Sequence, residues 1–179
     1  MREAMHDRAK FWRPAPDWNA AMLQGDGWTA RRVGGVGQTL VSGDLAAAIA
    51  ALAPGAPEVG LWGMVKPAEA FSLRIARDRA LLVTPSPLAL APGWRGGWVA
   101  TPCDDAYAVL EISGAAMPEI VAEGTAANLE AGSRSVAVLF AGVTAFLHRT
   151  APQTARLHVE SPFAAYLWTW LEGRISRPA

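Results

Sequence analysis

Three histidines are the side chains in this sequence best suited to binding a metal ion or moving a proton. His148 and His158 lie on two stretches that alternate between apolar and polar residues, as neighbouring antiparallel strands do, and His6 is near the N-terminus. In the hairpin that these stretches predict, His148 and His158 share a polar face but stand about four residues apart, roughly 13 Å along the strand. We therefore predict two separate histidines, solvated or at a sheet edge, that share no metal ion. Arg156 and Glu160 flank His158 on its strand face and favour a cross-strand ion network.

A second reactive group consists of Cys103 with Asp104 and Asp105 directly after it. A thiol beside a base could act as a nucleophile, and a carboxylate could act as a general base. No base accompanies Cys103 in the sequence, and two adjacent acids before a strand are typical of a turn. A single cysteine also excludes an internal disulfide framework and a cysteine-based zinc or iron–sulfur cage. We predict no catalytic, cofactor-binding or metal-binding residues.

The region from Asp104 to Gly124 has the pattern of a strand, a sharp turn and a helix. Alternating apolar residues predict the strand, and Ser113-Gly114 ends it because glycine adopts backbone angles that other residues avoid. Pro118 suits the first turn of the helix, and Gly124 suits its end. The turn could present the Ser113 hydroxyl to a substrate, but no base accompanies it. We interpret the turn as structural.

The same periodicities predict the other elements. Strands are predicted over 38–41, 59–65, 71–75, 79–84, 98–100, 135–140, 143–148 and 155–160, and helices over 45–52 and from 163 to Gly173. Ser42 or Asp44 can cap the first of these helices, and Ser161 can cap the second. The stretch 135–140 is apolar almost throughout and suits a central strand. The last three strands, joined by short links, predict an antiparallel meander.

Both halves of the chain follow the order strand, helix, strands, beginning at Gln38 and at Ala106. The predicted fold class is α+β, with two similar β-α-β-β type (ferredoxin-like) modules that have antiparallel sheets and pack into one compact unit. We predict an N-terminal arm over 1–30, a first module over 31–93 and a second module over 94–179.

Composition limits the classes of function. The chain has 179 residues, with 16 basic and 16 acidic side chains. It therefore lacks the electrostatic signature of a nucleic-acid-binding or membrane-surface protein. No apolar run reaches the ~18 residues that a membrane helix needs, and the N-terminus lacks the apolar core of a signal peptide. We expect a cytoplasmic protein without nucleic-acid or membrane contacts.

Eight tryptophans suggest contacts with protein partners, because large aromatic side chains dominate many interfaces. Three of them are spaced along the N-terminal arm, which we expect to pack on the domain or on a neighbour. Trp168 and Trp170 lie two apart on the last helix and so point in different directions. With Trp170 in the core, Trp168 remains for a partner or for the arm. The predicted partner-interface residues are Trp12, Trp18, Trp28 and Trp168.

Six segments share their residue order with one known family. They are Leu110–Gly114, Gly124-Thr125, Leu147–Arg149 and Leu157–Leu171, with Phe71–Arg74 and Arg79–Val83 in the first half. Together they resemble the gamma subunit of heterotetrameric sarcosine oxidase. The segment Leu157–Leu171, rich in aromatic residues, is the most specific, and the likeness covers roughly residues 36–172.

The resemblance implies the fold of the folate-binding region of the glycine-cleavage aminomethyltransferases. It also implies a complex that oxidises sarcosine with oxygen and passes the one-carbon unit to tetrahydrofolate. In that family the larger subunits carry the flavins and NAD, the smallest carries zinc, and the gamma subunit has no recognised catalytic residues. We therefore expect a non-catalytic, gamma-type subunit that acts in assembly and binds no cofactor of its own. The alternatives are a stand-alone folate-binding or aminomethyltransferase-like protein, with tetrahydrofolate as its ligand, and a self-associating structural module that forms homo-oligomers.

Overall fold

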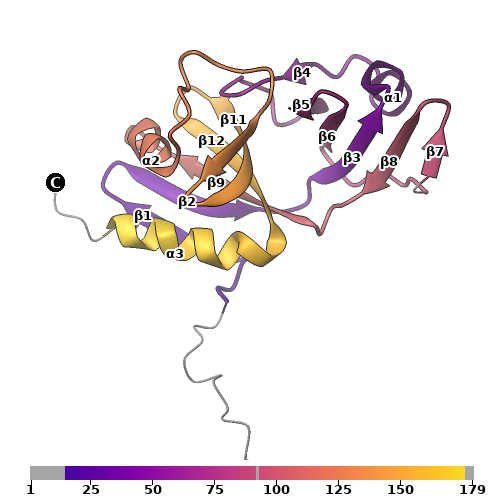
Figure 1. Ribbon diagram of the computed structural model, residues 1–179. Helices are drawn as coiled ribbons and strands as arrows, with labels where there is room; N and C mark the ends of the chain where they lie inside the picture. The colour runs from indigo at the N-terminus through magenta and orange to yellow at the C-terminus, as the bar shows by residue number, and fades with distance from the viewer. Residues whose placement is uncertain (1–14, 92, 176–179) are drawn as a thin grey trace, which may run out of the picture.

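The chain forms two six-stranded sheets, which a computed structural model describes over residues 15–91 and 93–175 (Figure 1). We call them the β9 sheet, with strand order β1-β2-β9-β12-β11-β10, and the β3 sheet, with strand order β4-β5-β6-β3-β8-β7. Neighbouring strands are antiparallel except β4 and β5, which are parallel. The β9 sheet contains β1 (Met22–Gly25), β2 (Trp28–Val33), β9 (Tyr107–Ser113), β10 (Ala137–Phe140), β11 (Val143–Ala151) and β12 (Thr154–Glu160). The β3 sheet contains β3 (Gly37–Gly43), β4 (Glu58–Val59), β5 (Phe71–Ala76), β6 (Arg79–Thr84), β7 (Gly93–Arg95) and β8 (Trp98–Pro102).

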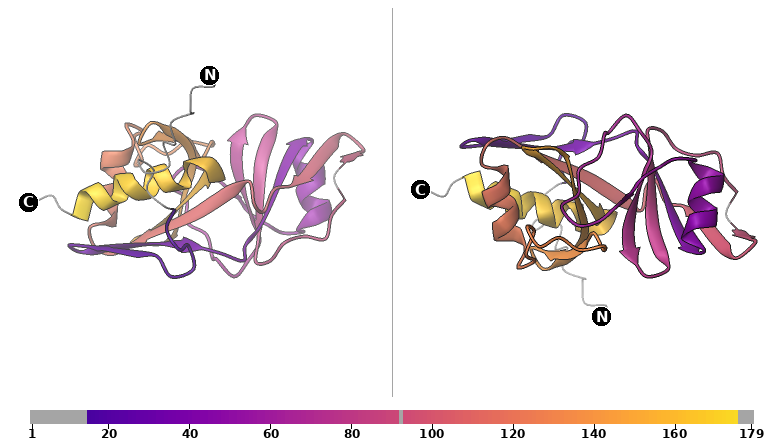
Figure 2. Two further views of the ribbon diagram at one scale, coloured as in Figure 1. Left: turned by 90° about the horizontal axis from the view of Figure 1, so that it is seen from below. Right: turned by 90° about the horizontal axis from the view of Figure 1, so that it is seen from above.

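Helices cover the outer face of each sheet, and the inner faces meet (Figure 2). The helix α1 (Leu45–Leu52) packs on the β3 sheet, while α2 (Met117–Gly124) and α3 (Ala164–Ile175) pack on the β9 sheet. A third apolar cluster fills the space between the sheets. It contains Phe71, Leu73, Leu81 and Val83 from the β3 sheet, Phe146 from the β9 sheet, and Val136 just before β10. The predicted α+β fold of two similar modules is confirmed.

Each sheet takes a hairpin from the opposite half of the chain. The β7–β8 hairpin directly precedes β9 in sequence but pairs with β3. The β1–β2 hairpin directly precedes β3 but pairs with β9. Both sheets therefore have the same order: an exchanged hairpin, a central strand that leads into a helix, then a second hairpin and an edge strand. Neither half of the sequence contains a complete sheet.

A glycine marks the point where each central strand meets the exchanged hairpin. Gly114, just after β9, has a φ of 123°, and a Cβ there would overlap the carbonyl oxygen of Gly27 in the β1–β2 turn. Gly43 ends β3 with a φ of 100°, and a Cβ there would overlap the carbonyl oxygen of Gly97 in the β7–β8 turn. The backbone N–H of Ala116 donates to the carbonyl of Gly27, and the backbone N–H of Asp44 donates to the carbonyl of Gly97, each at 3.0 Å. The backbone angle and the close approach both require glycine.

The predicted division of the chain does not follow the sheets. Residues 22–33, mostly assigned to an irregular arm over 1–30, form the β1–β2 hairpin. The β7–β8 hairpin lies in the β3 sheet, so the predicted boundary between 31–93 and 94–179 cuts through it. The prediction assumed that segments adjacent in sequence share a sheet, and the exchanged hairpins break that assumption.

Several local predictions are confirmed, including the strand over 38–41, the hairpin over 71–84, the helix that ends at Gly124 and the final meander. Asp44, one of two proposed caps, accepts the backbone N–H of Ala47 at 3.0 Å and caps α1. Ser161 does not cap α3, because its hydroxyl donates to the carbonyl of Asp105.

Three other elements differ from their predictions. The strand over 59–65 stops at Val59, because Gly60 approaches the backbone of Ser133 and Trp62 has a φ of 61°. The apolar stretch 135–140 forms an edge strand, β10, and not a central one. Its apolar residues serve two cores, since Val136 packs between the sheets and Phe140 under the helices. Helix α3 continues through Gly173 to Ile175.

We expect Gly114→Ala to lower the free energy of unfolding by at least about 2 kcal/mol, through backbone strain and overlap with Gly27. Gly34→Ala is the matched control, because a Cβ at Gly34 would meet no atom within 4 Å. The control should change stability by less than about 0.5 kcal/mol. Urea unfolding of both variants measures the difference, and equal midpoints would contradict the role given to Gly114.

Candidate functional site

A chain of polar side chains is buried between the two sheets. His148 on β11, His158 on β12 and Gln38 on β3 are each 0% to 1% exposed. The Nε2 atoms of the two histidines are 3.2 Å apart, and Nδ1 of His158 is 2.7 Å from Oε1 of Gln38. The amide Nε2 of Gln38 donates to the carbonyl of Tyr107 at 2.9 Å. We call this set the His–Gln chain.

The prediction of two distant, solvated histidines is wrong, because the β11–β12 register differs from the one assumed. His158 stands opposite Phe146, and His148 stands opposite Arg156. The histidines are therefore diagonal neighbours on one face, within reach of each other. The β3 sheet covers that face, and the ring of Phe71 lies 5.1 Å from that of His148. Strand alternation located the shared face, but the register and the covering sheet could not be read from it.

The hydrogen-bond partners fix the proton positions in the His–Gln chain. Gln38 must turn its amide nitrogen toward the carbonyl of Tyr107, so its Oε1 faces His158. His158 therefore carries its proton on Nδ1 and accepts on Nε2. His148 must then donate from its own Nε2. Both rings are neutral in this arrangement, and the three hydrogen bonds that join His148, His158, Gln38 and the Tyr107 carbonyl each have one donor and one acceptor. Nδ1 of His148, 3.4 Å from the carbonyl oxygen of Arg149, then carries no proton to donate to it.

Burial explains why both imidazoles stay neutral. It lowers the pKa of His148 from 6.5 to about 4, and it lowers the pKa of His158 well below 6.5, with further lowering by the nearby charge of Arg156. Neither ring lines any of the hollows described at the surface. The His–Gln chain links β11 and β12 of the β9 sheet to β3 of the other sheet.

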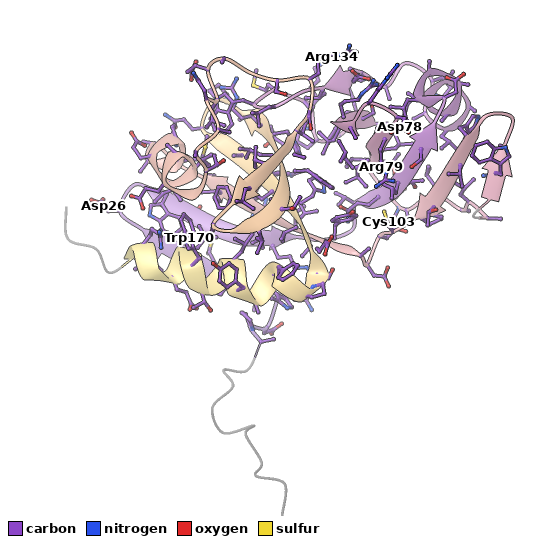
Figure 3. All side chains as sticks on the ribbon, viewed as in Figure 1. Asp26, Asp78, Arg79, Cys103, Arg134 and Trp170 are labelled. Atoms are coloured by element: carbon purple, nitrogen blue, oxygen red, sulfur yellow. The ribbon has the colours of Figure 1, made fainter. Side chains whose placement is uncertain are left out.

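The side chains of Cys103 and Asp104 are both hydrogen-bonded to the backbone of Gln38. Cys103, labelled in Figure 3, lies where the chain passes from β8 to β9. Its Sγ donates to the carbonyl of Gln38 at 3.3 Å, and burial raises its pKa to about 11. Asp104 accepts the backbone N–H of Gln38 at 2.6 Å. Cys103 is therefore a poor nucleophile, and the predicted turn over Asp104 and Asp105 is confirmed.

An ion triad lies on the same inner face of the β9 sheet, with Glu111 and Arg156 buried and Arg31 exposed. The Glu111 carboxylate accepts from Arg31 at 2.6 Å and from Arg156 at 2.8 Å. Burial alone would raise the pKa of Glu111, but the hydrogen bonds from Arg156 and Arg31 lower it. The predicted cross-strand network is confirmed for Arg156, whose partner is Glu111 and not its strand neighbour Glu160, which is exposed.

No metal site is visible in the part of the chain that the structure describes, where no three His, Cys, Asp or Glu side chains are placed to hold an ion. His6 lies outside the described residues. The Ser113 hydroxyl pairs with that of Thr29 at 2.9 Å across β9 and β2. The turn after β9 therefore anchors the exchanged hairpin, as the structural interpretation of Ser113 requires.

The predicted tryptophan interface is mostly internal. Trp28 and Trp168 are 4% and 3% exposed and belong to the core under α2 and α3. Trp18 packs edge-on against Trp168, with ring centroids 5.6 Å apart. Trp168 thus contacts the arm, the alternative left open for it. Trp170, labelled in Figure 3, is the more exposed of the two and packs under the guanidinium of Arg174. Trp12 lies outside the described residues.

The largest described hollow lies beside the edge strand β10 and has a volume of about 610 Å³. Its walls are β10 on one side and segment 125–135 on the other, and no charged side chain lines it. The polar groups that face it come from the backbone and from residues such as Asn128, Ser133 and Ser135. An uncharged ligand or a peptide segment fits this lining better than an ion.

No protein-family model matches the sequence, and neither does any curated protein sequence. Among solved structures, the fold is similar to that of a chain in the heterotetrameric sarcosine oxidase from Corynebacterium sp. U-96 in complex with pyrrole 2-carboxylate. The TM-score is 0.69 at 18% sequence identity, and the match covers 93% of this chain and 98% of that chain. The likeness shows a shared fold over nearly the whole length of both chains. The resemblance to the gamma subunit in particular stays a prediction.

The neutral histidines predict a pH-dependent stability. His148 takes up a proton near pH 6.5 when unfolded but only near pH 4 when folded. The unfolded state therefore binds more protons between these values, so His148 alone should lower the free energy of unfolding by on the order of 3 kcal/mol as pH falls from 6.5 to 4. Urea unfolding across this range measures the loss. The variant His148→Phe should show a shallower pH slope, and an unchanged slope would contradict the assignment.

Gln38→Leu should lower the free energy of unfolding by about 1 to 3 kcal/mol, because it leaves the Nδ1–H of His158 and the carbonyl of Tyr107 buried without partners. Gln24→Leu, at an exposed position on β1, is the matched control and should change stability by less than about 0.5 kcal/mol. Denaturant titration compares them. A loss at Gln38 no larger than at Gln24 would mean that the His–Gln chain does not hold the sheets together.

Proposed function

We propose that this chain is a non-catalytic subunit of a multi-subunit amine oxidase of the sarcosine oxidase kind, acting in assembly. The observation that supports this most is the full-length similarity to a chain of a heterotetrameric sarcosine oxidase. The match covers 98% of that chain, so the fold of this chain is similar to nearly all of one chain of such a complex.

The state of the reactive side chains supports a non-catalytic role. The imidazoles of His148 and His158 are buried and bonded to each other. The thiol of Cys103 is kept protonated by burial. The carboxylate of Glu111 is held between two arginines. Each group has a partner that a reaction would have to displace.

The remaining parts of the proposal follow the family resemblance. The larger subunits of the complex carry the flavins and NAD, and this chain carries no cofactor. The substrate class is a small secondary amine such as sarcosine, and the one-carbon unit goes to tetrahydrofolate. We place the complex in the cytoplasm. The described helices include none with the length and apolar character needed to cross a bilayer.

Affinity purification of the tagged full-length chain from its native source tests the proposal. We expect larger, flavin-bearing subunits to purify with it in fixed stoichiometry and to oxidise sarcosine. A chain that purifies alone, without flavin absorbance, would refute the subunit role. Calorimetric titration of the isolated chain with tetrahydrofolate then tests the stand-alone alternative, since heat release and a raised melting temperature would support a folate-binding protein instead.

A further inference from the structure

The outer edge of β10 has backbone groups that form no hydrogen bond with the described residues. The carbonyl of Val136 accepts from the N–H of Leu147 on β11. Because hydrogen-bonded and non-bonded pairs alternate in an antiparallel ladder, Val138 and Phe140 also bond to β11, and Leu139 points its N–H and C=O away from it. The side chain of Leu139 is 65% exposed. An exposed edge of this kind is a template for another strand.

The segment between α2 and β10 stands off from this edge. It forms the arch at the top of Figure 1, and Figure 3 labels Arg134 near its end. Backbone hydrogen bonds fix the arch to other parts of the chain. The carbonyl of Ser133 accepts from the N–H of Leu61, and the N–H of Val136 donates to the carbonyl of Arg74 on β5. The hollow of about 610 Å³ lies between the arch and β10 and is lined by Leu139 itself.

The shape and lining of the hollow favour one kind of occupant. The outward N–H and C=O of Leu139 can bond to an extended backbone, whereas the outward N–H of Ala137 already donates to Oγ of Ser135 at 3.2 Å. The uncharged lining, made mostly of small residues, suits uncharged side chains. A second copy of this chain would bring its own arch against the first, because the same segment walls the edge in both copies. A single extended segment of another protein can enter where a folded edge cannot.

We propose that an extended, uncharged segment of a partner protein adds to β10 as a further strand and fills the hollow beneath the arch. The inference rests on the proposed function, which supplies a larger subunit as the partner. It names the surface of this chain that the partner binds.

The test uses the complex obtained with the tagged full-length chain. Leu139→Pro removes the outward N–H without removing a bond to β11, and Leu139→Lys places a charge in the uncharged hollow. Each variant should retain about tenfold less of the flavin-bearing partner than the unmodified chain. Met22→Lys is the matched control, because Met22 is 64% exposed on β1, the opposite edge of the same sheet, and it should retain the partner fully. Circular dichroism melting of each isolated variant shows whether it is folded.

Hydrogen exchange gives a second readout that does not depend on a variant. The amide of Leu139 should exchange more slowly in the complex than in the isolated chain. If the unmodified chain retains no partner, the proposed function fails. If it retains the partner while both Leu139 variants do so equally and the amide stays unprotected, the docking surface is wrong and the subunit role stands. Sedimentation of the isolated chain as a dimer that Leu139→Lys dissociates would identify a second copy as the occupant and overturn the assignment.

Discussion

The structure depends on the exchange of two hairpins between the halves of the chain. Each central strand, β3 or β9, pairs on one side with a hairpin that precedes the other central strand in sequence. The contact is tight in both places, because Gly43 and Gly114 press against the turns of the incoming hairpins. The two modules therefore cannot complete their sheets separately. The repeat extends to the turn that ends each central strand, so the same close packing is needed twice.

The exchange brings the inner faces of the sheets together and buries the reactive side chains between them. His148 and His158 face the β3 sheet, and Gln38 on β3 supplies the acceptor that sets their protons. A neutral hydrogen bond adds only about 1 kcal/mol, but a buried group left without a partner costs about 1 to 3 kcal/mol. The polar groups between the sheets thus specify how the sheets meet more than they add to stability. The histidines, a residue type common in catalytic sites, are hydrogen-bonded between the two sheets.

Local sequence patterns predicted what depends on local physics. The alternation around 38–41 and 71–84, the capping of α1 by Asp44 and the helix stop at Gly124 all follow from neighbours within a few residues. The pairing of strands does not, because a hairpin can bond to any free edge. The predicted register of β11 against β12 was wrong by two residues, and it therefore placed His148 and His158 too far apart. Similarly, periodicity showed that Trp168 and Trp170 diverge, but only the position of β1 and the arm decides which is buried.

Apart from Nη1 of Arg95 and Nε of Arg174, the buried side-chain polar atoms of the described residues have hydrogen-bond partners. Further capacity for binding therefore lies mainly at the surface and in the sheet edges. An edge strand normally threatens solubility, and proteins protect such edges with charge, twist or cover. At β10 the cover is an arch that leaves room beneath it, with an exposed leucine facing the space. The arch keeps a broad, flat protein surface away from β10, but it leaves a narrow, extended polypeptide segment access to the β10 backbone. The described chain therefore keeps its buried histidines and Cys103 between the sheets, while the outward N–H and C=O of Leu139 remain reachable beside the arch.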